Sequence, residues 1–71
     1  MPISTPTVSV TITGLGTYST FADTLDAAIG AYRDESRDEL VKILKDRTAL
    51  DFSDVRDRSA LLVVIADYEG F

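Results

Sequence analysis

Two pairs of acidic residues have the spacing that acid–base chemistry requires. Asp34 and Asp38 are four positions apart, and Glu35 and Glu39 have the same spacing. In a helix, side chains at this spacing lie about 5–6 Å from each other, close enough for two carboxyl groups to act together on a substrate. Arginine and lysine residues are interspersed with these acids, which is typical of a solvated helix face. We therefore expect both pairs to have a structural or solubilising role.

The segment Gly14–Ser19 has part of the pattern of a dinucleotide-binding loop, in which glycines let the backbone approach a phosphate at a helix N-terminus. A serine stands where that pattern has its third glycine, and the acidic residues Asp23 and Asp26 follow. Carboxylates at this place repel a phosphate. We interpret the segment as a turn.

Other reactive groups are absent from the sequence. It contains no histidine and no cysteine, which excludes a zinc finger, a disulfide framework, a thiol nucleophile and a histidine base. The acidic segment Asp51–Asp57 lacks the glycine and the final glutamate of a calcium-binding loop. We expect no enzymatic activity, no cofactor and no metal site.

The chain has 71 residues, 12 of them acidic and 7 basic, with a net charge of -5 and 45% hydrophobic residues. This composition predicts a single folded domain over residues 1–71. No apolar run approaches the roughly 18 residues that span a membrane, and the start is not basic, so we expect a cytoplasmic protein without a membrane partner. Domains below about 70–80 residues commonly need a disulfide, a metal or a second chain. Since the first two are excluded, we predict a homodimer or a higher oligomer.

Residues 7–13, TVSVTIT, alternate strictly between apolar and hydroxyl side chains. The pattern predicts a strand whose Val8, Val10 and Ile12 face a core. Its other face is uncharged, and no lysine or proline protects it as an edge strand. We therefore expect the strand to be paired on both sides or covered. Two prolines within residues 1–6 indicate a flexible arm before it.

Two helices are predicted in the middle of the chain. The first covers residues 20–33, begins at a Thr-x-x-Asp sequence that resembles a capping box, and has an apolar stripe at helical spacing. The second covers residues 36–48 and opens with Ser36 and Glu39, a better capping box. One continuous helix over residues 21–47 also satisfies the periodicity, but we favour two.

The run Leu61–Ile65 is apolar on both faces, and periodicity alone does not distinguish a buried strand from a buried helix. Three β-branched residues favour a strand over residues 60–67. Such a strand would also give residues 7–13 an antiparallel partner. A helix over residues 53–68 is the competing interpretation. With the strand, the chain is an α+β domain of order β-α-α-β, whose short antiparallel sheet is extended by oligomerisation.

The predicted strand, the helix after it and the SRDELV opening of the second helix resemble ribbon-helix-helix repressors and antitoxins. The resemblance covers residues 7–47 and implies a dimer whose strands read the major groove of DNA, with a helix N-terminus on a phosphate. Carried over residue by residue, the base-facing positions are Ser9, Thr11 and Thr13, and the phosphate contact is Ser36. Neutralised phosphates supply much of the affinity for DNA, and the net charge is -5. We therefore do not expect a nucleic acid as the partner, and a DNA-binding repressor or antitoxin stays the alternative function.

The acidity has a further interpretation, as a surface that imitates the charge of DNA. Acidic residues would then have to gather in three dimensions, and basic residues stand between many of them in the sequence. An inhibitor of this kind stays an alternative. The candidates for such a patch are Asp23, Asp26, Asp51, Asp54 and Asp57.

The sequence favours a non-enzymatic protein-interaction module, an adaptor or inhibitor that acts on a protein partner and associates with itself. In scale it is similar to the small accessory proteins of bacteria and phages. The acidic, aromatic C-terminal end is either a docking motif or, as we expect more, an end that frays or whose aromatic residue folds back onto the core. The candidate interaction surface combines the hydroxyl face of the first strand with this end: Thr7, Ser9, Thr11, Thr13, Tyr68 and Phe71.

Overall fold

A computed structural model describes residues 6–71 of the chain, and the predicted arm over residues 1–6 lies almost wholly outside them. The α+β class and the short antiparallel sheet are confirmed, but the element order is β-β-α-α-α instead of β-α-α-β. None of the described helices is long and apolar enough to cross a membrane. The elements are β1 (Thr7–Ile12), β2 (Gly16–Phe21), α1 (Ala22–Tyr32), α2 (Arg37–Thr48) and α3 (Arg58–Glu69).

The first strand forms where the alternating pattern predicts it, one residue shorter than expected. Val8 and Val10 are half-buried and Ile12 is buried, while the hydroxyl residues between them are exposed. The partner of β1 is β2, in an antiparallel register that runs from Thr7 opposite Phe21 to Ile12 opposite Gly16. The expected pairing with residues 60–67 is therefore wrong.

Residues 13–15 form the turn of a hairpin and not the connection to a helix. The Leu15 N–H donates to the Ile12 carbonyl at 3.0 Å, and Gly14 has a φ of 84°. A positive φ at the third position of a four-residue turn is the requirement of a type II turn. The predicted turn over Gly14–Ser19 is confirmed at Gly14 and Leu15 alone, and from Gly16 onward the segment belongs to β2. Because only Tyr18 is buried in β2, the alternation there is too weak to predict a strand.

The first helix begins later than predicted, at Ala22, and its cap residue Phe21 makes no side-chain capping bond. The Thr-x-x-Asp sequence is therefore not used as a capping box. The second helix agrees with its prediction. The Glu39 N–H donates to Ser36 Oγ at 3.3 Å, and the Ser36 N–H donates to the Glu39 carboxylate at 3.3 Å. The two helices are separate, as favoured, because this box starts a new helix after α1 has ended at Tyr32.

The strand predicted over residues 60–67 is wrong, because this segment lies within α3. Asp57 caps the helix by accepting the Ser59 N–H at 3.0 Å, and Gly70 ends it in a left-handed conformation with a φ of 66°. Every residue from Ala60 to Ala66 is buried. A helix that is apolar on all sides is a buried helix. The competing interpretation, a helix over residues 53–68, is supported in type, but the helix begins only at Arg58.

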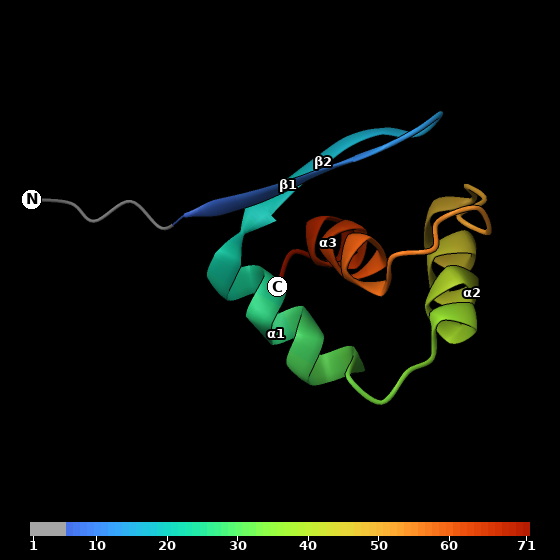
Figure 1. The fold of residues 1–71 in the computed structure, drawn as a ribbon. Helices are drawn as coiled ribbons and strands as arrows, with labels where there is room; N and C mark the ends of the chain where they lie inside the picture. Colours follow the sequence, from blue (N-terminus) through green and yellow to red (C-terminus); the bar gives the residue numbers. More distant parts are fainter. Residues whose placement is uncertain (1–5) are drawn as a thin grey trace, which may run out of the picture.

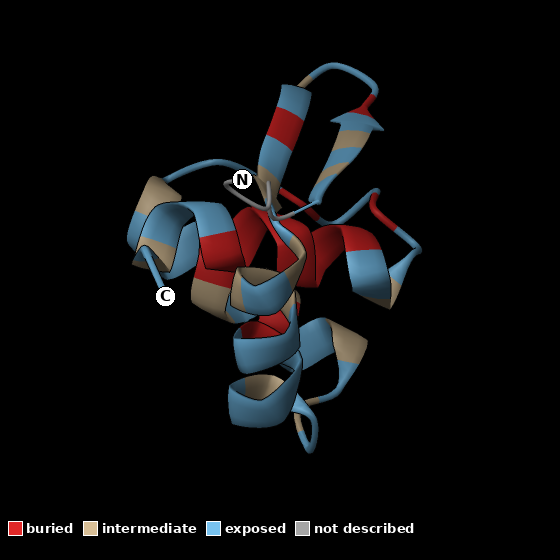
Figure 2. Cartoon of the chain, turned by 90° about the vertical axis from the view of Figure 1, so that its left-hand side faces the viewer, coloured by how far each residue is buried: buried red, intermediate tan, exposed pale blue. Residues whose placement is uncertain are grey.

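The chain is arranged around α3. The hairpin lies over it, and α1 and α2 pack on it from either side (Figure 1). The buried residues follow the length of α3, whereas the outer surfaces of the hairpin, α1 and α2 are exposed (Figure 2). The other fully buried large side chains are Leu40, Leu44 and Phe52. The hydrophobic core therefore consists of α3 and of the side chains from the other elements that pack directly on it.

Replacing Leu61 with alanine should lower the free energy of unfolding by about 3 kcal/mol, because it empties a fully enclosed site. The matched control is Leu50→Ala, at a position 37% exposed, which should cost less than about 1 kcal/mol. Urea denaturation of the two variants measures both values. Equal losses would contradict the central position of α3.

Candidate protein-binding surface

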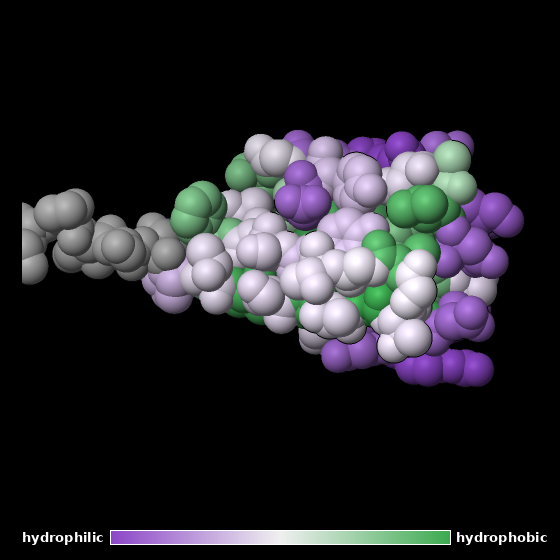
Figure 3. Space-filling view, turned by 90° about the horizontal axis from the view of Figure 1, so that it is seen from above, coloured by the Kyte–Doolittle hydropathy of each residue, from purple (hydrophilic) through white to green (hydrophobic). Residues whose placement is uncertain are grey.

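The outer face of the hairpin is an uncharged surface open to solvent. The outward side chains stand opposite one another in pairs, and Thr11 Oγ1 and Thr17 Oγ1 are hydrogen-bonded at 3.0 Å. Seen from above, most of this face has intermediate hydropathy, while hydrophilic residues gather at the end near α2 (Figure 3). All six outward residues are exposed: Thr7, Ser9, Thr11, Thr17, Ser19 and Phe21.

Among residues 6–71, no strand lies beside one edge of β1. The Ala22 N–H donates to the Pro6 carbonyl at 2.8 Å, which makes these two residues a hydrogen-bonded pair of the ladder. Such pairs alternate with non-hydrogen-bonded pairs, so the backbone groups of Val8, Val10 and Ile12 point to β2. In the described two-stranded sheet, the backbone N–H and C=O groups that point away from β2 are those of Thr7, Ser9 and Thr11.

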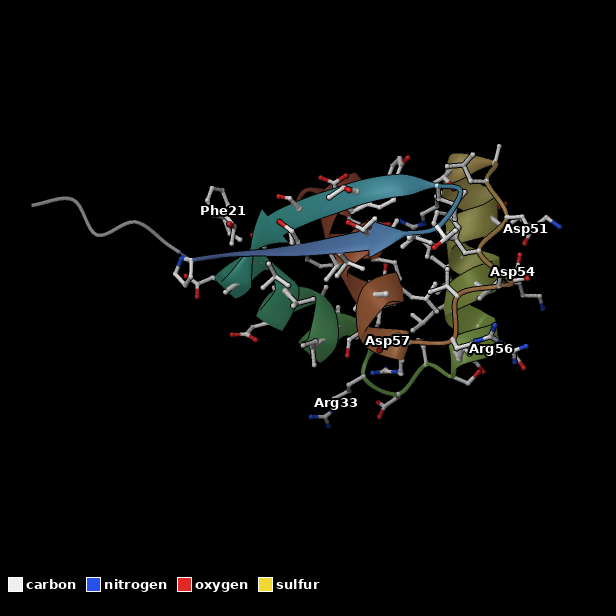
Figure 4. All side chains as sticks on the ribbon, turned by 45° about the horizontal axis from the view of Figure 1, so that its top comes forward. Phe21, Arg33, Asp51, Asp54, Arg56 and Asp57 are labelled. Carbon is white, nitrogen blue, oxygen red and sulfur yellow. The ribbon has the colours of Figure 1, made fainter. Side chains whose placement is uncertain are left out.

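A groove of about 560 Å³ lies between β1, the hairpin turn and the connection from α2 to α3. We call it the acid-rimmed groove. Its apolar lining residues are Val10, Ile12, Leu15, Val55 and Ala60, and its charged ones are Asp51, Asp54, Asp57 and Arg56. The charged residues lie beside the end of β1 that leads into the turn, opposite the end at which Phe21 projects (Figure 4). None of the residues that line the groove belongs to β2. The groove therefore follows the edge of β1 that faces away from β2.

Arg37 of α2 fixes the connection that forms the far wall of this groove. Its Nε donates to the Val55 carbonyl at 2.8 Å, and its Nη2 donates to the Ser53 carbonyl. Arg58 holds the previous connection in the same way, through the carbonyls of Tyr32 at 2.6 Å and Glu35 at 3.1 Å. Because a guanidinium group donates several hydrogen bonds in a fixed geometry, two arginines hold loops that have no regular structure.

Asp51 stabilises the same connection at its start. Its Oδ1 accepts the Ser53 N–H at 2.9 Å and also the Ser53 hydroxyl. Hydrogen bonds to the ionised form favour it, and those from Ser53 hold the pKa of Asp51 below its ordinary value of 3.8. The carboxylate is therefore charged at neutral pH and contributes to the negative rim.

A second hollow, of about 330 Å³, lies at the other end of the hairpin. We call it the aromatic hollow. Phe21, 55% exposed, and Phe71, 45% exposed, line it together with Thr7. Thr24 Oγ1 donates to the Phe71 carbonyl at 3.5 Å, and the Phe71 ring meets Tyr32 edge-on with 6.1 Å between centroids. The C-terminal end therefore folds back onto α1.

The six residues of the predicted surface lie in different places. Thr11 and Thr13 line the acid-rimmed groove, Thr7 and Phe71 line the aromatic hollow, and Ser9 lies on the hairpin face between them. Tyr68 is about half exposed, and its ring centroid lies 6.0 Å from that of Tyr18. Burial of the Tyr18 side chain, together with a hydrogen bond to Tyr68, raises the pKa of Tyr18.

Some residues of the surface were not predicted from the sequence. Thr17 and Ser19 belong to β2, which the sequence does not predict, and Phe21 falls within the range of the helix predicted over residues 20–33. Val55 lines the groove, and its carbonyl is held by Arg37, which is far from it in the sequence. Alternation of Thr17, Tyr18 and Ser19 is the one pattern that indicates the outer face of β2.

The carboxylate pairs lie on the surface. A hydrogen bond to Glu39 raises the pKa of Glu35, and the same bond lowers the pKa of Glu39, which also accepts the Ser36 N–H. Asp34 and Asp38 are almost fully solvated. Glu39 thus has a structural role in the capping box. Within residues 6–71, no group of three potential ligand residues is placed to hold a metal ion.

The acidic residues considered for a DNA-like surface are divided by the fold. Asp51, Asp54 and Asp57 surround the acid-rimmed groove, whereas Asp23 and Asp26 lie on α1, across α3 from it. The architecture implied by ribbon-helix-helix proteins also differs from the one observed, because β1 pairs with β2 of its own chain. Comparison with protein-family models, curated proteins and solved structures finds no match for the chain.

The stability of the wild-type protein relative to Asp51→Asn should depend on pH. A lowered pKa means that the folded state binds the proton less tightly than the unfolded state. The carboxylate therefore contributes stability above about pH 4, and this contribution is lost as the pH falls through the folded-state pKa. Melting temperatures of both proteins, measured from neutral to strongly acidic pH, should differ at pH 7 and converge in acid. A difference that stays constant with pH would contradict this.

Proposed function

We propose that this protein is a non-enzymatic protein-interaction module, an adaptor or inhibitor whose binding element is the hairpin. The observation that carries the proposal is the open edge of β1 beside the acid-rimmed groove. A strand edge without charge or proline is a template for pairing with another chain. A small domain that leaves such an edge exposed gains stability when a partner occupies it.

A protein partner fits this surface better than a nucleic acid. Three carboxylates stand beside the strand, with Arg56 as the one basic residue among those that line the groove. Phosphate groups are repelled by such a site, whereas main-chain amides and cationic side chains are attracted to it. We therefore propose protein contacts as the mode of action, within the cytoplasm.

We also propose that the protein associates with itself, through the aromatic hollow. Phe21 and Phe71 are large apolar residues that the chain leaves about half exposed there. Asp67 is the one charged residue that lines this hollow, so two copies meet there with little repulsion. Aromatic residues are the side chains that contribute most often to the centre of interfaces.

Co-expression of a tagged and an untagged copy in the native cell tests both contacts at once. Purification through the tag should retain the untagged copy and a second protein. Phe21→Asp should lose the untagged copy, because it charges the aromatic hollow. Thr11→Arg should lose the second protein, because a long charged side chain then stands beside the β1 edge. Mass spectrometry of the retained proteins is the measurement.

The control is Asp46→Arg, at an exposed α2 residue that lines neither the acid-rimmed groove nor the aromatic hollow, and this variant should retain everything. If no protein beyond a mock purification is retained, or if Thr11→Arg retains the same protein as the wild type, the proposed function is wrong. If the untagged copy is never retained, self-association is wrong.

A further inference from the structure

We infer that the open edge of β1 and the acid-rimmed groove together bind an extended, basic segment of the partner, which adds to the sheet as a third strand. This inference rests on the proposed function and specifies the chemistry of the partner. The bound segment alternates apolar and cationic side chains. Three observations support this, one for each kind of contact.

The first observation is the spacing of the free backbone groups. Ser9 and Thr11 both direct their N–H and C=O groups away from β2. Residues two apart in a strand are separated by about 6.6 Å, which is the repeat of an extended peptide. An added strand therefore finds donors and acceptors at its own spacing, which is how peptides bind to exposed sheet edges.

The second observation is the apolar interior of the groove next to this edge. Ile12 and Val55 are buried and Leu15 is half-buried, and all three line the groove beside the exposed Thr11. A peptide on the β1 edge points alternate side chains to opposite faces of the sheet. The side chains that point inward enter the groove, and an apolar residue is the one that matches its lining.

The third observation is the charge around the groove. Asp51, Asp54 and Asp57 line it with Arg56 as the one base, and the Ser53 hydrogen bonds keep Asp51 ionised. The neighbouring β1 and hairpin turn carry no charge at all. A lysine or arginine of the bound segment is therefore attracted to these carboxylates, and β1 carries no basic side chain that would already neutralise them.

A second copy of the chain fits this site poorly. A two-fold interface places the same surface on both partners, so the uncharged β1 edge of a second copy offers no basic side chain to the acid-rimmed groove. Each chain also carries a net charge of -5. Like charges facing each other across an interface are unfavourable. Charge complementarity therefore selects a basic segment for this edge.

The probe is a synthetic peptide of about seven residues with capped ends, in which lysine and valine alternate. A control peptide has glutamate in place of lysine. Both are titrated into the 15N-labelled full chain and followed by amide chemical shifts. The lysine peptide should shift the amides of residues 9–13 and 51–57 with saturable binding, and the glutamate peptide should not. Failure of the lysine peptide to bind at millimolar concentration would overturn the inference.

A pair of proline variants tests the edge itself. Ser9 and Ser19 are directly opposite each other, and each directs its N–H away from the partner strand. Proline removes one outward donor without breaking the β1–β2 ladder, which edge strands tolerate. Ser9→Pro should weaken binding at least about tenfold, and Ser19→Pro should leave it unchanged. The reverse result would place the peptide on β2 and overturn the inference.

A second pair tests the charge and does not depend on strand geometry. Asp54→Lys reverses a charge at the groove, whereas Asp26→Lys makes the same change on α1. The groove variant should weaken binding by about five- to tenfold, and the α1 variant should alter it less than about twofold. Equal effects would show that only the net charge matters and would contradict a localised site.

The outcomes separate this inference from the proposed function. If the lysine peptide does not bind while the tagged protein still retains a partner that Thr11→Arg loses, the chemistry inferred here is wrong and the module stands. If the peptide binds in the expected place but no partner is retained from cells, the edge is a peptide site and the proposed function is wrong.

Discussion

Burial of α3 is the constraint on which the rest of the structure depends. The residues from Ala60 to Ala66 include leucine, valine and isoleucine on every side of the helix, and all of them are buried. Covering one helix all round takes more surface than one neighbour supplies, so the hairpin, α1 and α2 each pack on α3. Since α1 and α2 pack on α3, none of the described elements is left to cover the outer face of the hairpin or to pair with the free edge of β1.

The position of the groove follows from the same constraint. Since α2 and the hairpin lie on different sides of α3, the connection from α2 to α3 passes beside the hairpin turn. Arg37 holds this connection through the carbonyls of Ser53 and Val55. Irregular backbone that carries charged side chains is thereby fixed next to an unpaired strand edge. A fixed surface binds with a smaller loss of conformational entropy than a loose one.

The sequence predicts those elements that carry local patterns. Alternation predicts β1, and the capping box of Ser36 and Glu39 predicts α2 almost to the residue. The strand expected over residues 60–67 fails because a run that is apolar on all sides has no period; the caps at Asp57 and Gly70, which the prediction did not use, define the helix. The groove was not predictable, since it depends on contacts between residues remote in sequence, such as those of Arg37 with the carbonyls of Ser53 and Val55.

Native-state amide hydrogen exchange tests the account most directly, because it reports the central helix and the open edge in one measurement. Amides of residues 61–66 should exchange slowest, through global unfolding alone. Within β1, the amides of Val8, Val10 and Ile12 should be protected by β2, and those of Ser9 and Thr11 should exchange freely. Uniform protection along β1, or faster exchange in α3 than in the hairpin, would contradict a chain built around α3 with an unpaired strand edge.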